Sequence, residues 1–182
     1  MNLIIGLGNP GDKFKKTRHN LGWDILDLLK EKWDFPEWKR LSRLKSNISK
    51  KDKIILAKPQ TFMNLSGLAV KSLKSYYKAR INNLIIIQDD IDIELGKIKI
   101  SKNRGTAGHK GVQSIIDSLG TKNFIRIRIG IKPKDKKTVD KFVLSRFSKE
   151  EKENIEKAKT DVLEAIEIIL NKDLSEAMKK FN

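Results

Sequence analysis

Cysteine is absent from this chain of 182 residues, and histidine occurs only twice, at His19 and His109. Without cysteine the chain has neither a disulfide framework nor a thiolate metal site. Two histidines that lie far apart along the sequence offer little for zinc. We therefore expect no bound metal and no other cofactor.

Long apolar runs are also missing. No uninterrupted run approaches the roughly 18 residues that a membrane-spanning helix needs. The N-terminal MNLIIGLGNPG has no basic leading region and too short an apolar stretch for a signal peptide. We expect a cytoplasmic protein without a membrane partner, and the length fits one domain over residues 1–182.

Acidic side chains are few compared with basic ones. Lysine and arginine number 39 and aspartate and glutamate 23, which gives a formal net charge of +16. Such an excess favours a polyanionic partner such as a nucleic acid. A bias in coding toward lysine gives the same composition, so the positions of the charges decide between the two explanations.

Strand and helix patterns alternate along the chain. Thr17 is a plausible N-cap for the first helix. The patterns predict strands over 2–7, 84–87, 97–101 and 124–129, a hairpin with strands over 46–49 and 54–57, helices over 18–30, 64–77, 112–119, 149–170 and 174–181, an irregular stretch over 34–40 and a basic loop over 132–138. This alternation predicts a single three-layer α/β/α domain with a mixed, mostly parallel central sheet.

Two patterns resemble nucleotide or metal sites and fail on closer reading. The glycines of GLGNPG (6–11) match G-x-G-x-x-G, but Pro10 interrupts the turn and no acidic residue closes the next expected strand. LIIIQDD (84–90) resembles a magnesium-binding strand, but no phosphate-binding loop accompanies it. A calcium loop starting at Asp90 would need glycine where Leu95 stands.

Polar residues interrupt apolar elements at several strand ends and helix starts, namely Asn9, His19, Asn64, Asp89 and the pair His109-Lys110. Such ends converge at one edge of an open α/β sheet. Asp89 there would accept the proton of one imidazole nitrogen of His19, fix its tautomer and leave the ring free to take a proton from water. No serine or cysteine stands at a nucleophile elbow, so direct attack by water is more natural than a covalent intermediate. Taken singly, Asn9 can be a turn residue and Asn64 a helix N-cap.

Two expected strands carry basic faces. Lys97 and Lys99 share one face of their strand, and Arg126 and Arg128 share one face of theirs. Side chains two positions apart on a strand lie roughly 7 Å from one another, near the spacing of successive phosphates. These faces predict contacts with a nucleic-acid backbone that read no sequence, although a solvated strand face has the same pattern.

The chain resembles the bacterial peptidyl-tRNA hydrolase family in several long segments, in the family's order. They are GLGNPGDKFKKTRHNLG (6–22), KPQTFMNLSG (58–67), QDDIDIELGKIKI (88–100), GHKG (108–111), FIRIRIGI (124–131) and FVLSRF (142–147). The resemblance implies a single-domain, usually monomeric, metal-free α/β esterase. Such an enzyme cleaves the ester joining a peptide to the 3′ end of tRNA and so recycles tRNA from aborted translation.

The resemblance also implies roles for individual residues. His19 would be the general base and Asp89 its carboxylate partner, while Asn9 and Asn64 would orient the water and the peptide-ester end. The remaining matches are Phe14 and Met63, which would line the site, and Lys99 and Arg128, which would contact the tRNA backbone.

Three positions depart from the family's pattern. Lys110 stands where asparagine is common, Gln88 where histidine is frequent, and Phe14 where tyrosine is common. Lys110 keeps the ability to meet a phosphate or a developing oxyanion, so we expect it to bind substrate. Since the base, its carboxylate and both amides are retained, we expect an active enzyme. An RNA-binding protein without catalysis is the alternative, and a peptidase or small-molecule esterase is a third reading that the basic strand faces disfavour.

Overall fold

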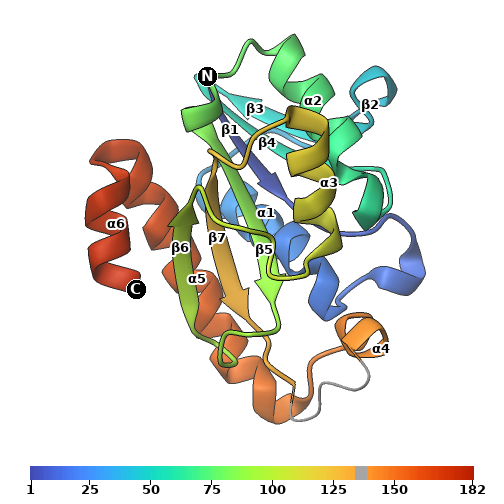
Figure 1. The fold of residues 1–182 in the computed structure, drawn as a ribbon, viewed down its shortest axis with the longest axis vertical. Coiled ribbons are helices and arrows are strands. Elements are labelled where there is room, and N and C mark those ends of the chain that lie inside the picture. Colours follow the sequence, from blue (N-terminus) through green and yellow to red (C-terminus); the bar gives the residue numbers. More distant parts are fainter. Residues whose placement is uncertain (134–138) are drawn as a thin grey trace.

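The computed structural model describes residues 1–133 and 139–182, so most of the basic loop predicted over 132–138 lies outside the described residues. One sheet of seven strands runs through the molecule in the order β2-β3-β4-β1-β5-β7-β6 (Figure 1). The strands are β1 Asn2–Gly6, β2 Lys39–Leu41, β3 Ser46–Lys51, β4 Ile54–Pro59, β5 Leu84–Asp90, β6 Ile98–Lys102 and β7 Ile125–Gly130. Strands β4, β1, β5 and β7 pair in parallel, whereas β3 and β6 run antiparallel to their neighbours. The predicted mixed sheet is confirmed.

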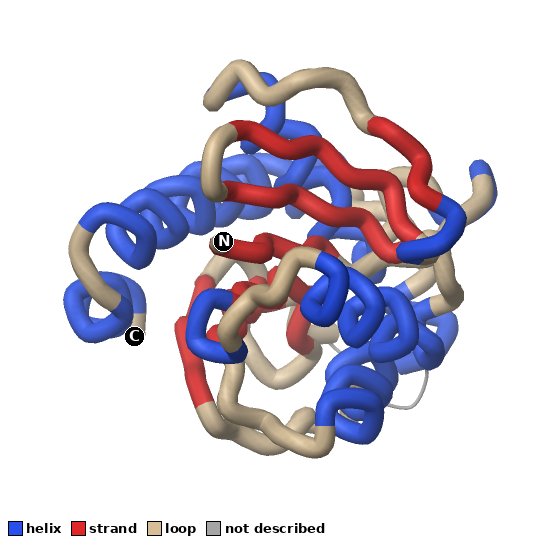
Figure 2. The backbone as a smooth tube through the Cα atoms, turned by 90° about the horizontal axis from the view of Figure 1, so that it is seen from above, coloured by secondary structure: helices blue, strands red, loops and turns tan. Residues whose placement is uncertain are grey.

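Helices cover both faces of this sheet. They are α1 Leu21–Lys32, α2 Ser66–Tyr76, α3 Lys110–Leu119, α4 Val139–Val143, α5 Lys149–Asn171 and α6 Leu174–Phe181. Side chains of α1 and α5 share one apolar core with the sheet, and side chains of α2 and α3 share the other. Viewed from above, the strands lie between the two sets of helices (Figure 2), which confirms the predicted three layers. No helix among the described residues combines the length and the apolar character that crossing a membrane requires.

The central strands β1 and β5 are apolar on both faces because helices cover both sides. Ile85 and Ile87 of β5 point into the core with α1 and α5, while Leu84 and Ile86 point into the core with α2 and α3. Since β1 and β5 are parallel neighbours, their carboxyl ends meet at one edge of the sheet. The residues that follow these ends are therefore brought close together.

Close packing of α1 on β1 explains two glycines of the 6–22 segment. A Cβ atom added to Gly6 would lie 2.1 Å from the carbonyl oxygen of Gly22, and one added to Gly22 would lie 2.5 Å from the backbone nitrogen of Leu7. Only glycine allows this approach. It fixes the start of α1, and the 3₁₀ turn η2 (Arg18–Asn20) just before it, at the carboxyl edge of the sheet.

The starts of two helices differ from the prediction because 3₁₀ turns precede them. Helix α1 begins at Leu21 and not at residue 18, and Thr17 donates its hydroxyl to the carbonyl of Phe14 (2.7 Å) and does not cap α1. Helix α2 begins at Ser66, after the 3₁₀ turn η4 (Met63–Leu65). Asn64 is thus an exposed turn residue and not the N-cap of α2.

Two short elements escaped the prediction. Strand β2 (Lys39–Leu41) includes the last two residues of the stretch that was predicted to be irregular, 34–40. It pairs antiparallel with β3 at the edge of the sheet. Helix α4 has five residues. Elements this short carry too few residues for a periodic pattern to show.

Candidate active site

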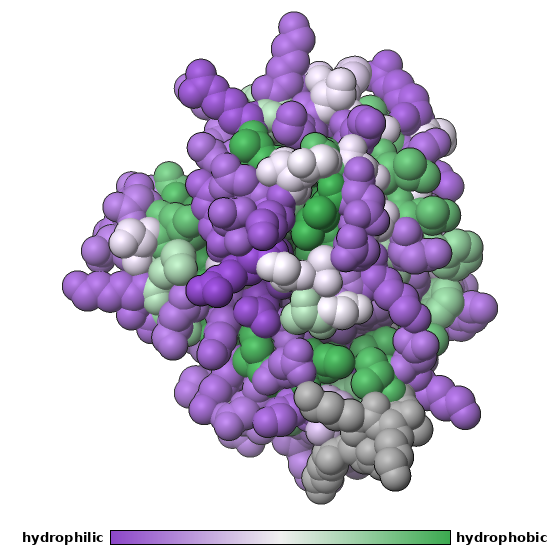
Figure 3. All heavy atoms as spheres, in the orientation of Figure 1, coloured by the Kyte–Doolittle hydropathy of each residue, from purple (hydrophilic) through white to green (hydrophobic). Residues whose placement is uncertain are grey.

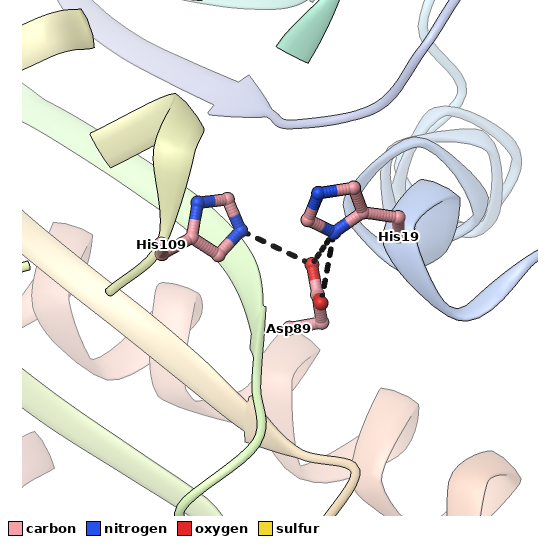
Figure 4. A group of neighbouring side chains, drawn as sticks. All are labelled: His19, Asp89 and His109. Atoms are coloured by element: carbon pink, nitrogen blue, oxygen red, sulfur yellow. Dashed lines mark hydrogen bonds and ion pairs between the residues drawn. The ribbon is translucent and has the colours of Figure 1, made fainter. Parts of the chain in front are cut away.

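The buried carboxylate of Asp89, near the end of β5, binds both histidines of the chain (Figure 4). The Nδ1 atom of His19 lies 2.9 Å from each oxygen of Asp89, and the Nε2 atom of His109 lies 3.2 Å from Oδ1. Only 2% of the Asp89 side chain and 12% of the His19 side chain are exposed. The structure therefore brings His19 and Asp89 together across the sheet edge.

The two imidazole rings bind Asp89 through opposite nitrogens. The Nδ1 atom of His109 accepts hydrogen bonds from the backbone N–H groups of Gly111 (3.1 Å) and Val112 (3.3 Å), so this side chain is the N-cap of α3. A nitrogen that accepts these bonds carries no proton, so the neutral ring donates Nε2–H to Asp89. His19 donates Nδ1–H instead, and its Nε2 points away from the carboxylate (Figure 4). Of the two rings, His19 is the one with a nitrogen left to accept a proton.

Asp89 keeps its charge despite its burial. Burial on its own would raise the pKa of this carboxyl, but the charge and the hydrogen bonds of His19 and His109 hold the pKa well below its ordinary value. A carboxylate that stays ionised fixes the tautomer of His19 and stabilises the imidazolium that forms when the ring takes a proton.

His19, Asp89 and His109 also form a group whose ligand atoms all lie within 4.8 Å of one another. A metal ion needs an unprotonated nitrogen from each histidine. His109 meets this need at Nε2 only if its proton moves to Nδ1, where it would face the N–H groups of Gly111 and Val112. The hydrogen bonds of this group thus suit a proton network better than a metal centre.

Asn9 follows β1 and connects three segments of the site. Its Oδ1 accepts a hydrogen bond from the backbone N–H of Met63 (2.8 Å), and its own backbone N–H and carbonyl bind the side-chain amide of Asn20. These bonds join the end of β1 to η4 and to η2. Because the side-chain oxygen is engaged, the amide nitrogen Nδ2 is the end of Asn9 that a substrate can meet.

A groove of about 410 Å³ opens beside His19 and contains the other residues predicted to bind substrate. It is lined by Asn9, Phe14, His19, Phe62, Met63, Asn64, Lys110, Asp140, Val143 and Leu144. Phe62 was not predicted; it is 55% exposed and meets the ring of Phe14 edge to face at 6.4 Å. A largely apolar groove of this kind can hold the apolar side chains of a ligand.

A smaller cavity of about 50 Å³ lies on the Asp89 side of His19 and is lined by residues of the α3 start and of α4. Lys110 and Asp140 line both this cavity and the groove, and their side chains form an exposed ion pair (2.9 Å) between α3 and α4. The ammonium of Lys110 lowers the pKa of Asp140.

Hydrophilic side chains gather over β6 and β7, beside α3 (Figure 3). Lys99 and Arg128 are direct cross-strand neighbours there, and the guanidinium of Arg128 binds the buried Asp90 (2.8 Å). Lys99 is exposed and Arg128 is partly exposed, so both reach solvent on this face.

Arg126 does not take part in this basic surface, contrary to the prediction that it shares a solvent-facing strand face with Arg128. Its side chain is only 1% exposed and donates to the carbonyl oxygen of Gly105 (2.6 Å), in the loop before α3. Burial and the neighbouring charge of Arg128 lower the pKa of Arg126 to about 10. The loop before α3 thus covers this face of β7 at Arg126 and leaves it open to solvent at Arg128.

Comparison with known proteins identifies close relatives over the full length of the chain. The family model described as peptidyl-tRNA hydrolase matches residues 3–182. A peptidyl-tRNA hydrolase from Thermodesulfovibrio yellowstonii is 46% identical, with 100% of this chain and 99% of the relative covered, and one from Mycoplasma mycoides is 44% identical with both chains fully covered. The crystal structure of peptidyl-tRNA hydrolase from Acinetobacter baumannii superposes with a TM-score of 0.92 at 29% identity, over 100% of this chain and 94% of that one. These matches confirm the resemblance.

Proposed function

Because the chain belongs to the peptidyl-tRNA hydrolase family, we propose that it hydrolyses the ester joining a peptide to the 3′ end of tRNA. One observation carries this proposal. His19 donates Nδ1–H to a buried, ionised Asp89 and keeps Nε2 free at the end of an apolar groove. That arrangement is what a general base acting on water requires.

In the proposed reaction, Nε2 of His19 removes a proton from a water molecule while the oxygen of this water attacks the carbonyl carbon of the ester. Asp89 stabilises the imidazolium that forms. When the carbon–oxygen bond of the ester breaks, the same proton passes from His19 to the departing 3′ oxygen of the ribose. The products are a peptide with a free carboxyl end and a tRNA with a free 3′ hydroxyl, and no covalent intermediate forms.

The residues around the groove supply the remaining functions. The Nδ2 amide of Asn9 donates to the developing oxyanion, and Asn64 and Lys110 hold the ester end of the substrate. Phe14, with Phe62 and Met63, contacts the apolar part of the peptide. Each of these side chains lines the same groove as His19.

The tRNA backbone binds to the basic face of β6 and β7 through Lys99 and Arg128. The net charge of +16 supports the attraction of a polyanion to this surface. We propose that the chain acts in the cytoplasm as a monomeric single domain over 1–182, with neither a metal nor another cofactor.

The alternative of an RNA-binding protein without catalysis leaves the two histidines unexplained. A binder has no need for a carboxylate that fixes one ring in the tautomer suited to a base. A small-molecule esterase would not need the basic face of β6 and β7.

The test is to incubate the protein with N-blocked aminoacyl-tRNA and to follow the appearance of free tRNA. We expect release by the native protein, with or without a chelator, and release that is slower by up to about 10²–10⁴-fold by Asp89→Asn, because Asp89 acts through His19. This variant should still bind tRNA. Arg43→Met is a matched control, because Arg43 contacts Tyr76 at the surface and neither residue is among the described residues that line the groove or the cavity. Binding of the tRNA without release by the native protein would identify a binder, and faster cleavage of small esters than of the tRNA ester would favour the third reading.

A further inference from the structure

Arg18 directly precedes His19 in η2, and the mechanism above gives it no role. Its side chain is only 6% exposed. The guanidinium donates through Nη2 to Oε2 of Glu151 (2.7 Å) and through Nε to the hydroxyl of Ser145 (3.1 Å). The guanidinium carbon lies 4.2 Å from the ring centre of Phe142 and 4.6 Å from that of Phe147. A planar, delocalised cation is the side chain that meets all four partners at once.

Three of these partners, Phe142, Ser145 and Phe147, belong to one side of the candidate site. We call residues 139–147 the α4 wall, because Val139, Asp140, Val143 and Leu144 of this segment line the groove or the cavity beside His19. The main chain adds a second connection. The backbone N–H of Arg18 donates to the carbonyl of Ser145 (2.9 Å), and the residues on either side of these two, Thr17 and Arg146, form a β-bridge.

Glu151 connects the same guanidinium to a rigid element. It is in the first turn of α5, and its Oε2 also accepts the backbone N–H of Ser148 (2.8 Å) in a capping box. Burial alone would raise the pKa of Glu151, but the hydrogen bonds from Arg18 and Ser148 lower it, so the ion pair persists at neutral pH. Helix α5 packs against the sheet through a long apolar stripe. The side chain of Arg18 thus connects three parts of the molecule. They are the turn that carries His19, the α4 wall and helix α5 on the sheet.

Packing alone does not require a cation here. Among the residues that the structure describes, Nη1 of Arg18 is buried without a hydrogen-bond partner, which is unfavourable for a charged group. An apolar side chain would fill the space beside the rings of Phe142 and Phe147 without that disadvantage. What an apolar side chain cannot do is fix the direction of the contact with Ser145 and Glu151.

We propose that Arg18 is a positioning residue that sets the distance between the α4 wall and Nε2 of His19. The wall then holds the ester against the base, and a loss of the contact leaves His19 intact but the ester misplaced. Misplacement by about 1 Å lowers turnover by on the order of 100-fold. This inference rests on the proposed role of His19.

The test compares Arg18→Ala with the native protein in the N-blocked aminoacyl-tRNA assay. We expect kcat to fall on the order of 100-fold, while KM for the tRNA changes little, since Lys99 and Arg128 lie on another face. Ethylguanidinium at millimolar concentration should restore part of kcat by occupying the space that the guanidinium leaves beside Phe142 and Phe147. Potassium chloride at the same ionic strength should not, and His19→Ala should gain nothing from ethylguanidinium.

A second measurement follows the wall itself. Arg18→Lys keeps the charge but loses the planar fork of donors, so we expect it to lose less kcat than Arg18→Ala. We also expect trypsin to cleave it after Lys141 faster than it cleaves the native protein or Arg43→Met. Should Arg18→Ala fail to fold, Glu151→Gln removes the ion pair at a side chain that is 25% exposed, and we expect it to lower kcat in the same direction.

An Arg18→Ala protein that melts like the native one and keeps its kcat overturns the proposal. The proposal is also overturned if Arg18→Ala loses kcat only in proportion to its loss of thermal stability and ethylguanidinium restores none of it. If the native protein itself releases no tRNA, the proposed function fails, whereas cleavage after Lys141 still reports whether Arg18 holds the wall.

Discussion

Two regions of the molecule meet at Asp89, the η2 turn with His19 and the loop before α3 with His109. Both present an imidazole to the same carboxylate, at 2.9 Å and 3.2 Å. At the start of α3, the N–H groups of Gly111 and Val112 occupy the second nitrogen of His109. At η2 the second nitrogen of His19 is directed away from Asp89. The backbone around a ring, and not the ring or its partner, decides which histidine keeps a nitrogen that can accept a proton.

Removal of His19 should have the largest effect. A general base typically contributes about 10²–10⁴-fold to a rate, so we expect His19→Ala to lower kcat within that range. Binding of tRNA should persist, because Lys99 and Arg128 are untouched. Single-turnover release of free tRNA measures the first quantity and filter binding the second. Full activity of His19→Ala would remove the distinction between the two histidines.

His109→Asn tests the two hydrogen-bonding roles of His109 separately, the bond to Asp89 and the cap of α3. Asparagine is a good N-cap, so it should retain the bond to the N–H groups of α3 and thus the melting temperature. It is too short to reach Asp89. A hydrogen bond to a charged group is worth about 1.5–3 kcal/mol, which corresponds to roughly 10- to 150-fold in a rate, and we expect kcat to fall by no more than this.

His109→Ala is the matched partner of that variant. It loses the cap as well, which should lower the free energy of unfolding by about 0.5–2 kcal/mol. Its kcat should equal that of His109→Asn. If both variants lose as much activity as His19→Ala, His109 takes part in the chemistry directly and the comparison fails.

The sequence indicated that His19 and Asp89 lie close together because one is a polar residue at a helix start and the other at a strand end, and such positions converge at one edge of an open α/β sheet. It did not reveal the role of His109. That role depends on a ring nitrogen that meets the backbone two and three residues further on, which composition and periodicity do not show. A histidine directly before an apolar helical pattern was the available signal, in the place where an N-cap stands.

One error arose because the exposure of a strand face depends on segments distant in sequence. The strand pattern placed Arg126 and Arg128 on one face correctly, but whether a face is open depends on what covers it. Here a loop that passes over the strand buries Arg126 and leaves Arg128 accessible. The helix starts at residues 18 and 64 were misplaced because 3₁₀ turns share the local composition of the first helical turn.

The contrast between Arg128 and Arg126 leads to a smaller effect, on binding. Arg128→Ala should weaken tRNA binding and reduce the slope of log affinity against log salt by about 1, as expected for one lost phosphate contact. Lys99→Ala should do the same without uncovering Asp90. Arg126→Met should leave the slope unchanged, because its charge is sealed from solvent. Titrations at several salt concentrations measure all three, and equal slopes for Arg128→Ala and Arg126→Met would contradict the assignment.

The smallest effect should come from the ion pair of Lys110 and Asp140, which joins α3 to α4 near both histidines. The side chains are 63% and 80% exposed, and such pairs are screened by water and salt. We expect Lys110→Asn to change kcat/KM by no more than a few-fold, since an amide can still donate to the substrate at this position. Asp140→Asn breaks the same pair and keeps Lys110. If Lys110→Asn alone lowers kcat, the ammonium acts on the substrate directly; if both variants lower it equally, the pair itself holds α3 and α4 in place.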